Sequence, residues 1–320
     1  MNVLFISTYK YSLETWSKSS TLDREMQFFN FMSKTYGVNF TFLTYGTKID
    51  KNYLGNNNFL VFPMFNEKIP QSNFKTIFMT FRYIVSNKSK FEEIDLIYHN
   101  QLNGMWLGIL AKLLLNKPLI FRSGYDTYRF SKYENKSFIK KYFFKLLTNF
   151  SFIFADLFTV SSKSDYEYSK NYFFQPKKIE LRRNWISQVE NSKNKIKQKD
   201  IISVGRLEKQ KNYIKFLNDF SSKNFSIDIY GSGANYEILK NQINKQNLNI
   251  ELKGTVTNSQ LKNLYSNYRF FVSTSLFEGN PKTVLEAMSS GCIPVLSNID
   301  NHRELVDHNE NGFLVELDKN

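Results

Sequence analysis

Cysteine and histidine are scarce in this chain, and their scarcity limits its chemistry. Among 320 residues there are one cysteine and three histidines. A single cysteine excludes an internal disulfide and is typical of proteins in a reducing compartment. The histidines are scattered and no Asp-x-Asp pair occurs. We therefore expect a cytoplasmic protein that needs no metal and no cofactor, and we expect Cys292 to be an inert core thiol because it precedes an apolar run.

The chain also lacks an uninterrupted apolar run long enough to span a membrane. Its longest apolar stretch, Met105–Phe121, is broken by two lysines and a proline, so it is typical of a helix followed by a strand. Val3–Ser7 is too short for the hydrophobic region of a signal peptide. Neither a phosphate-binding P-loop nor a Gly-x-Ser-x-Gly motif is present, which disfavours P-loop nucleotide hydrolysis and serine-hydrolase chemistry.

Positive charge, by contrast, is abundant. The formal net charge is +14, and the first 190 residues hold 26 Lys and Arg against 15 Asp and Glu. Two interpretations fit this half of the chain: a surface that faces an anionic membrane or a phosphorylated acceptor, or a lysine-rich solvated surface. No nucleic-acid-binding motif accompanies the charge, so we expect no nucleic-acid partner.

Apolar runs of strand length alternate with amphipathic stretches of helix length. We expect strands at Val3–Ser7, Asn39–Thr44, Leu60–Phe62, Asp95–Tyr98, Leu119–Phe121, Leu157–Val160, Ile179–Leu181, Ile201–Val204, Ile227–Tyr230, Ile250–Leu252, Arg269–Thr274, Ile293–Leu296 and Phe313–Val315. The alternation predicts an α/β fold with parallel, doubly wound sheets. Hydrophobic residues make up 42% of the chain, enough for the cores of two domains. The polar stretch Ser187–Lys199 predicts a linker between domains at residues 1–188 and 198–320.

One expected helix, Lys136–Phe154, is rich in both lysine and phenylalanine. A basic, aromatic helix can lie on a membrane surface. It can equally be a core helix with a solvated lysine face, which is the more common case. The residues leave both interpretations open.

The most informative stretch is Phe277–Gly291, which lies between two apolar, β-prone runs. Asn280 is a favourable N-cap, and Pro281 suits the first position of a helix. Gly291 suits the left-handed residue that often ends a helix. The segment therefore predicts a loop and a helix between two strands.

Glu278 lies in that expected loop and Glu286 on that expected helix. The loop follows the carboxyl end of a strand, where open α/β sheets bind ligands. The free N–H groups of a helix start favour an anion, and carboxylates accept hydrogen bonds from sugar hydroxyls. This combination suits a ligand with hydroxyls and phosphates. The alternative is a solvated loop glutamate and a helix-surface charge.

A second strand-to-helix loop carries cations. Arg206 and Lys211 follow the expected strand at 201–204, and an arginine with a lysine suits a diphosphate. Two solvated loop cations are the alternative. Gly231 and Gly233 follow the next strand in the pattern Gly-Ser-Gly, which is a weak nucleotide-binding signal by itself because it lacks a third glycine.

Residues 307–312 match the start of a calcium-binding loop. The last ligand of such a loop would be Asp318 instead of a glutamate, and the strand expected at 313–315 leaves no exit helix. We therefore expect no calcium site.

The stretch Phe277–Gly291 resembles the donor-site motif of family 4 of the retaining glycosyltransferases, in which two glutamates are separated by seven residues. Here those glutamates are Glu278 and Glu286, within E-G-N-P-K-T-V-L-E-A-M-S-S-G. The flanking Ser273–Ser275 and G-C-I-P-V-L-S match the family as well. V-G-R-L-E-K-Q-K-N resembles its phosphate-binding loop, and the resemblance is strongest over residues 201–315.

The resemblance implies the GT-B architecture, in which two Rossmann-like domains face a cleft, the first holding the acceptor and the second the nucleotide-sugar. It implies three catalytic residues: Arg206 and Lys211, which neutralise the diphosphate, and Glu278, which contacts the donor sugar. Glu286 would hold the ribose hydroxyls. The other residues implied at the nucleotide-sugar site are Gly205, Gly231, Gly233, Gly279, Asn280, Pro281 and Thr283.

The implied reaction is metal-independent transfer of a sugar, with retention, from a nucleoside-diphosphate sugar to a glycan or lipid-linked acceptor in cell-surface polysaccharide or glycolipid synthesis. Peripheral contact with the inner face of the membrane is left open. A nucleotide-sugar epimerase or hydrolase and a non-catalytic nucleotide-sugar-binding protein are the alternatives. Relatives continue past the last strand with helices that a chain ending at Asn320 would lack.

In the first domain, Trp16, Lys18 and Arg24 are candidate acceptor contacts, with ordinary surface residues as the alternative. Relatives often place a histidine near the strand end at 122–126, where this sequence has none. We therefore assign no catalytic histidine. His99 either lines the cleft or, as is more common, is structural.

Overall fold

A computed structural model describes residues 1–54, 59–175, 178–186, 197–219 and 225–317. The chain divides into two compact units, Met1–Arg183 and Asn184–Asn320, which we call the amino-terminal and carboxy-terminal units. The expected linker falls mostly on residues 187–196, which lie outside the described residues, whereas Lys199 at its end belongs to a strand.

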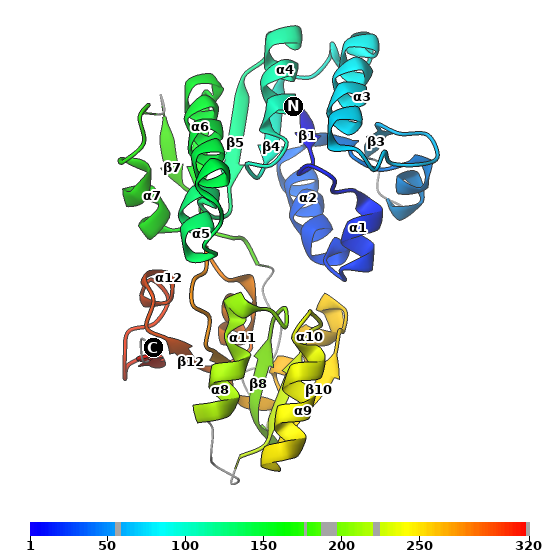
Figure 1. The fold of residues 1–320 in the computed structure, drawn as a ribbon. Coiled ribbons are helices and arrows are strands. Elements are labelled where there is room, and N and C mark those ends of the chain that lie inside the picture. The colour runs from blue at the N-terminus through cyan, green and yellow to red at the C-terminus, as the bar shows by residue number, and fades with distance from the viewer. Residues whose placement is uncertain (55–58, 176–177, 187–196, 220–224, 318–320) are drawn as a thin grey trace. The chain divides into compact units, whose positions relative to one another are not determined.

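The described part of the amino-terminal unit contains a parallel sheet of seven strands in the order β3-β2-β1-β4-β5-β6-β7 (Figure 1). The strands are β1 (Asn2–Ile6), β2 (Asn39–Thr44), β3 (Leu60–Pro63), β4 (Leu96–Asn100), β5 (Leu119–Ser123), β6 (Leu157–Val160) and β7 (Ile179–Leu181). The helices are α1 (Leu13–Lys18), α2 (Leu22–Tyr36), α3 (Asn73–Ser86), α4 (Met105–Leu115), α5 (Thr127–Tyr133), α6 (Phe138–Phe154) and α7 (Lys163–Ser169), with 3₁₀ helices η1 (Lys48–Tyr53) and η2 (Lys88–Phe91).

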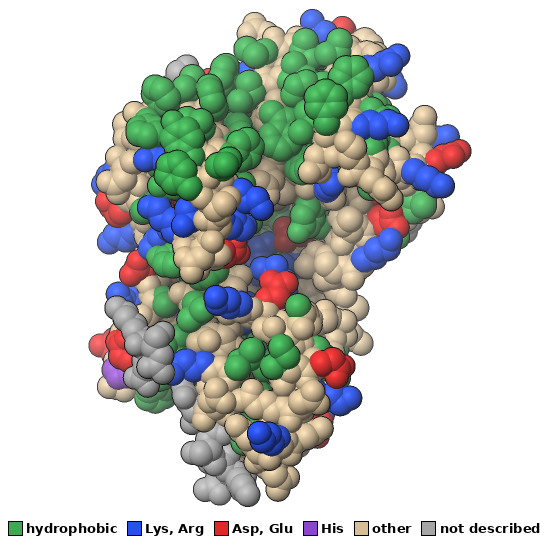
Figure 2. All heavy atoms as spheres, in the orientation of Figure 1, with side chains coloured by type: hydrophobic (Ala, Val, Ile, Leu, Met, Phe, Trp, Pro, Cys, Tyr) green, Lys and Arg blue, Asp and Glu red, His purple; other side chains and the backbone are tan. Residues whose placement is uncertain are grey.

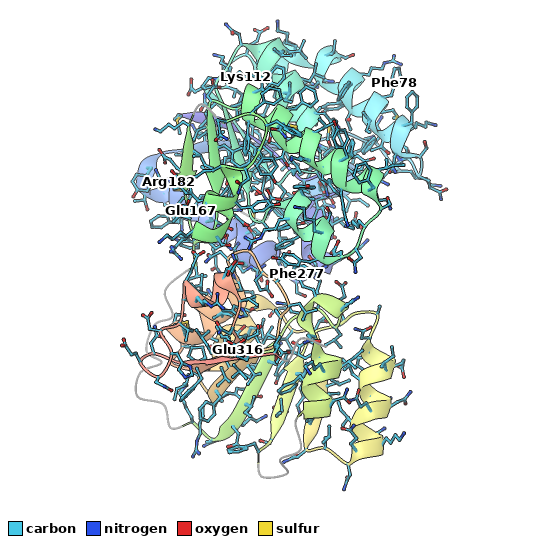
Figure 3. All side chains as sticks on the ribbon, turned by 60° about the vertical axis from the view of Figure 1, so that its left-hand side comes forward. Phe78, Lys112, Glu167, Arg182, Phe277 and Glu316 are labelled. Atoms are coloured by element: carbon cyan, nitrogen blue, oxygen red, sulfur yellow. The ribbon has the colours of Figure 1, made fainter. Side chains whose placement is uncertain are left out.

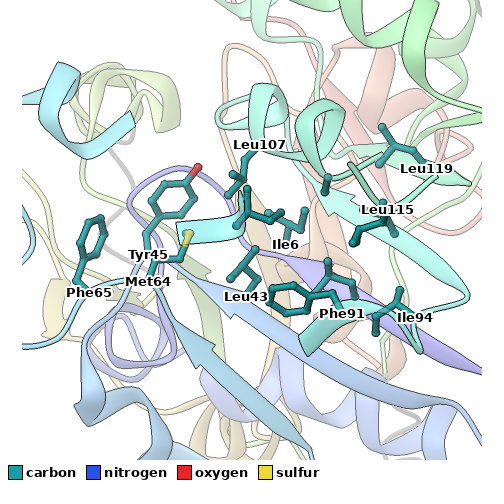
Figure 4. Packing of buried hydrophobic residues seen from close by; sticks show 14 residues of the cluster. Ile6, Leu43, Tyr45, Met64, Phe65, Phe91, Ile94, Leu107, Leu115 and Leu119 are labelled. Atoms are coloured by element: carbon teal, nitrogen blue, oxygen red, sulfur yellow. The ribbon is translucent and has the colours of Figure 1, made fainter. Parts of the chain in front are cut away.

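Side chains of these strands alternate between two cores, as the period of two in a strand requires. In β1, Leu4 and Ile6 join the cluster that packs against α3 and α4. Their neighbours Val3 and Phe5 join the cluster that packs against α2. Helices therefore cover both faces of the sheet, which is the doubly wound arrangement. Figure 4 shows the first cluster, with Ile6 close to Leu107 of α4.

The described part of the carboxy-terminal unit contains a parallel sheet of six strands in the order β10-β9-β8-β11-β12-β13 (Figure 1). The strands are β8 (Lys199–Val204), β9 (Ile227–Tyr230), β10 (Ile250–Gly254), β11 (Tyr268–Ser273), β12 (Ile293–Ser297) and β13 (Phe313–Val315). The helices are η3 (Lys209–Lys211), α8 (Tyr213–Asp219), α9 (Tyr236–Gln246), α10 (Asn258–Tyr265), α11 (Lys282–Ser289) and α12 (Asp300–Arg303).

The predicted α/β class with parallel, doubly wound sheets is confirmed, and each expected strand is present. Helices α1 and α5 were not expected. The polar segment around α1 hides a six-residue helix that buries only Leu13 and Trp16, too few apolar residues to show helical spacing. Its start is fixed locally by a capping box between Ser12 and Thr15. Among the described residues, no helix is both long and apolar enough to cross a membrane.

Candidate functional site

The two loops that the sequence singles out follow neighbouring strands of the carboxy-terminal sheet. β8 lies between β9 and β11, so the strand order reverses at that point. Such a switch point is where open α/β sheets bind ligands. Because parallel strands end at the same edge of a sheet, residues 205–212 after β8 and residues 274–281 after β11 lie side by side. We call them the cation loop and the acid loop.

An ion pair joins the two loops. Lys211 Nζ lies 2.6 Å from Glu278 Oε1, and the two side chains are only 15% and 10% exposed. A charge-assisted hydrogen bond of this length is strong, and little water screens it. The predicted cation and the predicted acid, 67 positions apart in the sequence, therefore meet.

Backbone contacts hold the loops in this register. The Thr274 hydroxyl donates to the carbonyl oxygen of Lys211 at 2.9 Å. The Gln210 amide donates to the carbonyl oxygen of Phe277 at 2.9 Å, and the Leu276 N–H donates to the carbonyl oxygen of Gln210 at the same distance. Phe277 is labelled in Figure 3, in the segment between β11 and α11. These three bonds to main-chain carbonyl oxygens fix the two loops against each other, so the ion pair is not a chance encounter of two long side chains.

Glycines make this close packing feasible. A Cβ on Gly205 would lie 2.8 Å from Lys211 Cε, so the lysine side chain passes over a residue that has none. A Cβ on Gly231, whose φ is +149°, would lie 1.9 Å from the carbonyl oxygen of Gly205. One on Gly233 would lie 2.6 Å from the carbonyl oxygen of Leu207. The Gly-Ser-Gly turn after β9 thus packs directly on the cation loop.

Arg206 is placed differently from Lys211. Its side chain is 68% exposed and its guanidinium lies 3.0 Å from Glu208 Oε2. It also donates to Gln210 Oε1 at 3.1 Å. Gln210 itself contacts the acid loop, so Arg206 lies beside that loop, whereas its own contacts are with Glu208 and Gln210 of the cation loop.

Glu278 is ionised in this setting. Burial alone raises the pKa of its carboxyl, but the charge and hydrogen bond of Lys211 and a hydrogen bond from Ser275 outweigh burial and leave the pKa below its usual value. The carboxylate is thus held in the form that accepts hydrogen bonds from hydroxyl groups.

Glu286 lies on α11 and is 2% exposed. Asn258, at the start of α10, donates its side-chain amide to Glu286 Oε1 at 3.1 Å. The alternative of a helix-surface charge is therefore wrong. Thr283 is half-buried on the first turn of the same helix.

One local prediction about this helix is wrong. Asn280 does not cap it: the N-cap position is Pro281, no side chain caps the helix, and α11 begins at Lys282. The Asn280 side-chain oxygen instead accepts a hydrogen bond from the Asn184 N–H at 2.8 Å. A partner 96 positions away thus takes the oxygen that local sequence assigns to the cap. Gly291 does adopt the predicted left-handed backbone, with φ +79°, and Gly279 is buried in the acid loop.

Sequence reasoning missed His302, which lies on α12 and is fully buried. Its Nδ1 lies 2.8 Å from the carbonyl oxygen of Ser297, to which an N–H donates. Burial lowers the pKa of His302, the Ser297 carbonyl and the Glu278 carboxylate raise it, and the Lys211 ammonium lowers it, with a net decrease. The ring is therefore neutral and close to the ion pair. The sequence signal that could have identified His302 is its position after β12, because β12 ends at the same edge of the sheet as β11 and β8.

The remaining candidates lie in the amino-terminal unit or outside the loops. Trp16 is buried in the core around α2 and Lys18 pairs with Glu14 at the surface. His99 is fully buried beside Phe121, and burial lowers its pKa to about 3, which fits a structural histidine. Cys292 is buried and burial raises its pKa to about 11, as expected for an inert thiol.

Two further contacts bear on expected sites. Arg24 lies 3.5 Å from Glu25 at the start of α2. In the segment considered for calcium, Asn311 Oδ1 accepts a hydrogen bond from the Asp307 N–H at 2.9 Å, whereas Asp318 lies outside the described residues. Within the described ranges, no three His, Cys, Asp or Glu side chains gather as a metal site.

Comparison with solved structures defines the fold class. The chain superposes on HepE from Anabaena, solved in complex with UDP and glucose, with a TM-score of 0.76 and 16% identity, over 99% of this chain and 86% of that one. The two-sheet architecture is that of the GT-B glycosyltransferases. At this identity the likeness concerns the fold alone.

Comparison with families and curated proteins is more specific. Residues 186–319 match the family model described as "Glycosyl transferases group 1". The predicted resemblance is confirmed at this level, and the narrower assignment to family 4 stays a prediction.

Two curated relatives come from Campylobacter jejuni subsp. jejuni serotype O:2. One is N-acetylgalactosamine-N,N'-diacetylbacillosaminyl-diphospho-undecaprenol 4-alpha-N-acetylgalactosaminyltransferase, 26% identical over 71% of this chain. The other is GalNAc-alpha-(1->4)-GalNAc-alpha-(1->3)-diNAcBac-PP-undecaprenol alpha-1,4-N-acetyl-D-galactosaminyltransferase, 24% identical over 66% of this chain. The matches span 63% and 57% of the lengths of these relatives.

Proposed function

We propose that the protein is a glycosyltransferase that moves a sugar, with retention at the anomeric carbon, from a nucleoside-diphosphate sugar to a glycan or lipid-linked acceptor. The observation that carries the proposal is the Lys211–Glu278 ion pair at the switch point of the carboxy-terminal sheet. It lies within the segment that matches the glycosyltransferase family. A cation and an ionised acid fixed side by side suit a ligand with a diphosphate next to a sugar.

Each residue then has a distinct role. Lys211 and Arg206 bind the diphosphate, Glu278 accepts hydrogen bonds from donor-sugar hydroxyls, and Glu286 accepts those of the ribose. In the reaction, the bond between the anomeric carbon and the diphosphate oxygen breaks, and its electron pair leaves with the diphosphate. The oxygen of the acceptor hydroxyl forms the new bond on the same face of the sugar, and its proton passes to the departing diphosphate. The two cations offset the growing negative charge, which we expect to be the largest catalytic contribution.

The backbone of the site supplies the remaining contacts. Gly205, Gly231 and Gly233 bring two strand ends within van der Waals distance, so a nucleotide can approach main-chain N–H groups there. Gly279, Asn280, Pro281 and Thr283 lead into the start of α11, whose free N–H groups suit a phosphate or sugar oxygen. We propose that these residues bind the nucleotide-sugar.

The acceptor and the place of action follow from the relatives. Two of them are named for undecaprenol-linked acceptors, and we propose a lipid-linked or glycan acceptor for this chain, used on the cytoplasmic side of a membrane in cell-surface polysaccharide or glycolipid synthesis. The amino-terminal unit would hold this acceptor and the carboxy-terminal unit the donor. Peripheral membrane contact is part of this proposal.

Donor binding is tested first, by thermal shift of the full chain with UDP, GDP, ADP and their sugar conjugates. We expect one nucleotide series to raise the Tm, by an amount that grows with concentration. Arg206→Ala should abolish most of the shift while leaving the Tm of the free protein unchanged. Lys209→Ala is the matched control, because Lys209 is an exposed cation on the same loop. No shift with any nucleotide, or equal loss in both variants, would contradict the donor site.

Turnover is tested separately. The donor found by thermal shift is incubated with undecaprenol-diphosphate-linked saccharides, and sugar transfer is measured with and without acceptor and with EDTA. We expect product only when acceptor is present, no effect of EDTA, and loss of product in Arg206→Ala. Donor breakdown without acceptor would favour an epimerase or hydrolase, and binding without turnover of any acceptor would favour a non-catalytic nucleotide-sugar-binding protein.

A further inference from the structure

Helix α6 exposes large apolar side chains and buries polar ones over much of its length. Its buried side chains are the polar Thr148, Asn149 and Ser151 and the apolar Phe152. Large apolar side chains point outward instead, and they are Phe138, Ile139, Tyr142, Phe143, Phe150 and Ile153, with Phe138 and Ile139 both 80% exposed. At about 100° per residue these six fall on one side of the helix. A soluble helix normally turns this side inward, so the outward face is built to contact something apolar.

Helix α3 repeats the reversal. Thr76 and Thr80 are fully buried, whereas Phe74 and Phe78 are 82% and 59% exposed and Val85 is 54% exposed. Phe74, Phe78 and Val85 follow one another at intervals of four and seven residues, so their side chains lie along one outward stripe of the helix. The hydroxyls of the buried threonines are satisfied within the helix itself, through Ser72 and Ile77, which makes the inward placement of polar residues tolerable.

The two reversed helices belong to one continuous surface. Helix α4 packs between α3 and α6 and adds the exposed Leu113. Figure 2 shows hydrophobic side chains gathered over this part of the amino-terminal unit, with Lys and Arg side chains at the lower margin, and Figure 3 labels Phe78 at its outer side. We call the outward side chains of α3, α4 and α6 the apolar face. A patch of this extent marks an interaction surface.

The charge of the apolar face is of one sign. Within α3, α4 and α6, all of which are fully described, there is no Asp or Glu, and the six charged residues are Lys75, Arg82, Lys112, Lys140, Lys141 and Lys145. Lysine stems can lie along apolar surface while their ammonium groups reach outward. Protruding aromatic side chains with interspersed lysines are the combination that binds at the interface of an anionic bilayer.

We propose that the apolar face docks the protein on an anionic lipid bilayer, with the aromatic and aliphatic side chains of α6 and α3 in the headgroup region. A second copy of this chain is a poorer partner, because two such faces would bring the lysines of α6 and the cations of α3 against one another, and among the described residues only Lys112 of α4 has a carboxylate partner, Asp156. This docking assigns a surface to the peripheral membrane contact of the proposed function, but it requires no turnover and is tested independently of glycosyl transfer. It would also bring the amino-terminal unit to the surface where a lipid-linked acceptor lies.

The test is co-sedimentation of the full chain with vesicles of phosphatidylethanolamine containing phosphatidylglycerol, and with vesicles of phosphatidylcholine alone. We expect binding to the anionic vesicles, weakened by salt. The double variant Phe138→Ser, Ile139→Ser should lose at least about tenfold in partitioning, because two large apolar side chains no longer enter the lipid. Lys140→Glu should lose about fivefold on the anionic vesicles only.

Matched controls separate docking from folding. Tyr36→Ser removes a 65% exposed aromatic from the end of α2, and Lys245→Glu reverses an exposed charge on α9; neither should change vesicle binding. Because Phe138 and Ile139 are so exposed, the double variant should keep the wild-type Tm and circular dichroism. No binding to anionic vesicles, or equal binding of the double variant, would overturn the proposal. So would sedimentation equilibrium showing a dimer that the double variant abolishes, which would assign the face to a second copy.

Discussion

Lys211 and Arg206 lie on the same loop, and the motif assigns both to the diphosphate. Their exposure and their partners in the structure differ. Lys211 is 15% exposed and locked to a carboxylate of the neighbouring loop. Arg206 is 68% exposed and contacts the side chains of Glu208 and Gln210 on its own loop. Lys211 therefore holds the two loops together as well as belonging to the proposed donor site, whereas Arg206 is exposed where a ligand can reach it.

The comparison shows how stability and function can be separated at this site. Removing a member of a buried ion pair leaves its partner's charge in a poorly solvated place, whereas removing an exposed cation leaves water to solvate the remainder. A Lys211 variant can therefore lose activity through lower stability as well as through the missing ligand contact. An Arg206 variant can lose activity only through the missing ligand contact.

The largest expected effect is on stability in Lys211→Met. Glu278 would remain buried without its cation, and we expect the free energy of unfolding to fall by about 3 kcal/mol, measured by urea denaturation. Arg206→Met should change it by less than about 0.5 kcal/mol. The double variant Lys211→Met, Glu278→Gln should recover part of the loss, because no unpaired charge remains. Equal losses in the two single variants would remove the distinction between the cations.

A smaller effect is expected where the cation loop packs on its neighbour. Gly231→Ala places a Cβ against the carbonyl oxygen of Gly205, 1.9 Å away before relaxation, and should cost more than about 1 kcal/mol. Gly254→Ala is the matched control: its φ is also positive, at +70°, but nothing lies within 4 Å of its Cβ. A similar cost in both variants, again from urea denaturation, would mean that backbone conformation alone matters and that the cation loop is not held by this contact.

These contrasts mark what the sequence could and could not predict. The strands and the left-handed Gly291 follow from local pattern, because alternation and backbone preference act over a few residues. The ion pair does not, because it requires β8 and β11 to be neighbours, and pairing is decided by the whole sheet. Asn280 shows the same limit, since Asn184 takes the oxygen that local sequence gives to a helix cap. His302 and the reversed polarity of α6 likewise emerge only when distant segments are packed together.

The smallest expected effect is on how the free energy of unfolding depends on pH, and it compares the acid partners of the two cations. The folded-state pKa of Glu278 lies below its usual value, so its ionisation stabilises the fold above the unfolded pKa of about 4.3, and this contribution is lost as the pH falls through the folded pKa. We therefore expect the difference in unfolding free energy between wild type and Glu278→Gln to narrow as the pH is lowered from about 6 to about 3. Protonation of the buried His302 in acid also destabilises the folded protein, because burial lowers its pKa. His302 is present in both proteins, so this loss is common to them. Glu208→Gln, which removes the exposed partner of Arg206, should differ little from wild type at every pH, and a difference that narrows as much as that of Glu278→Gln would show that exposure does not distinguish the two pairs.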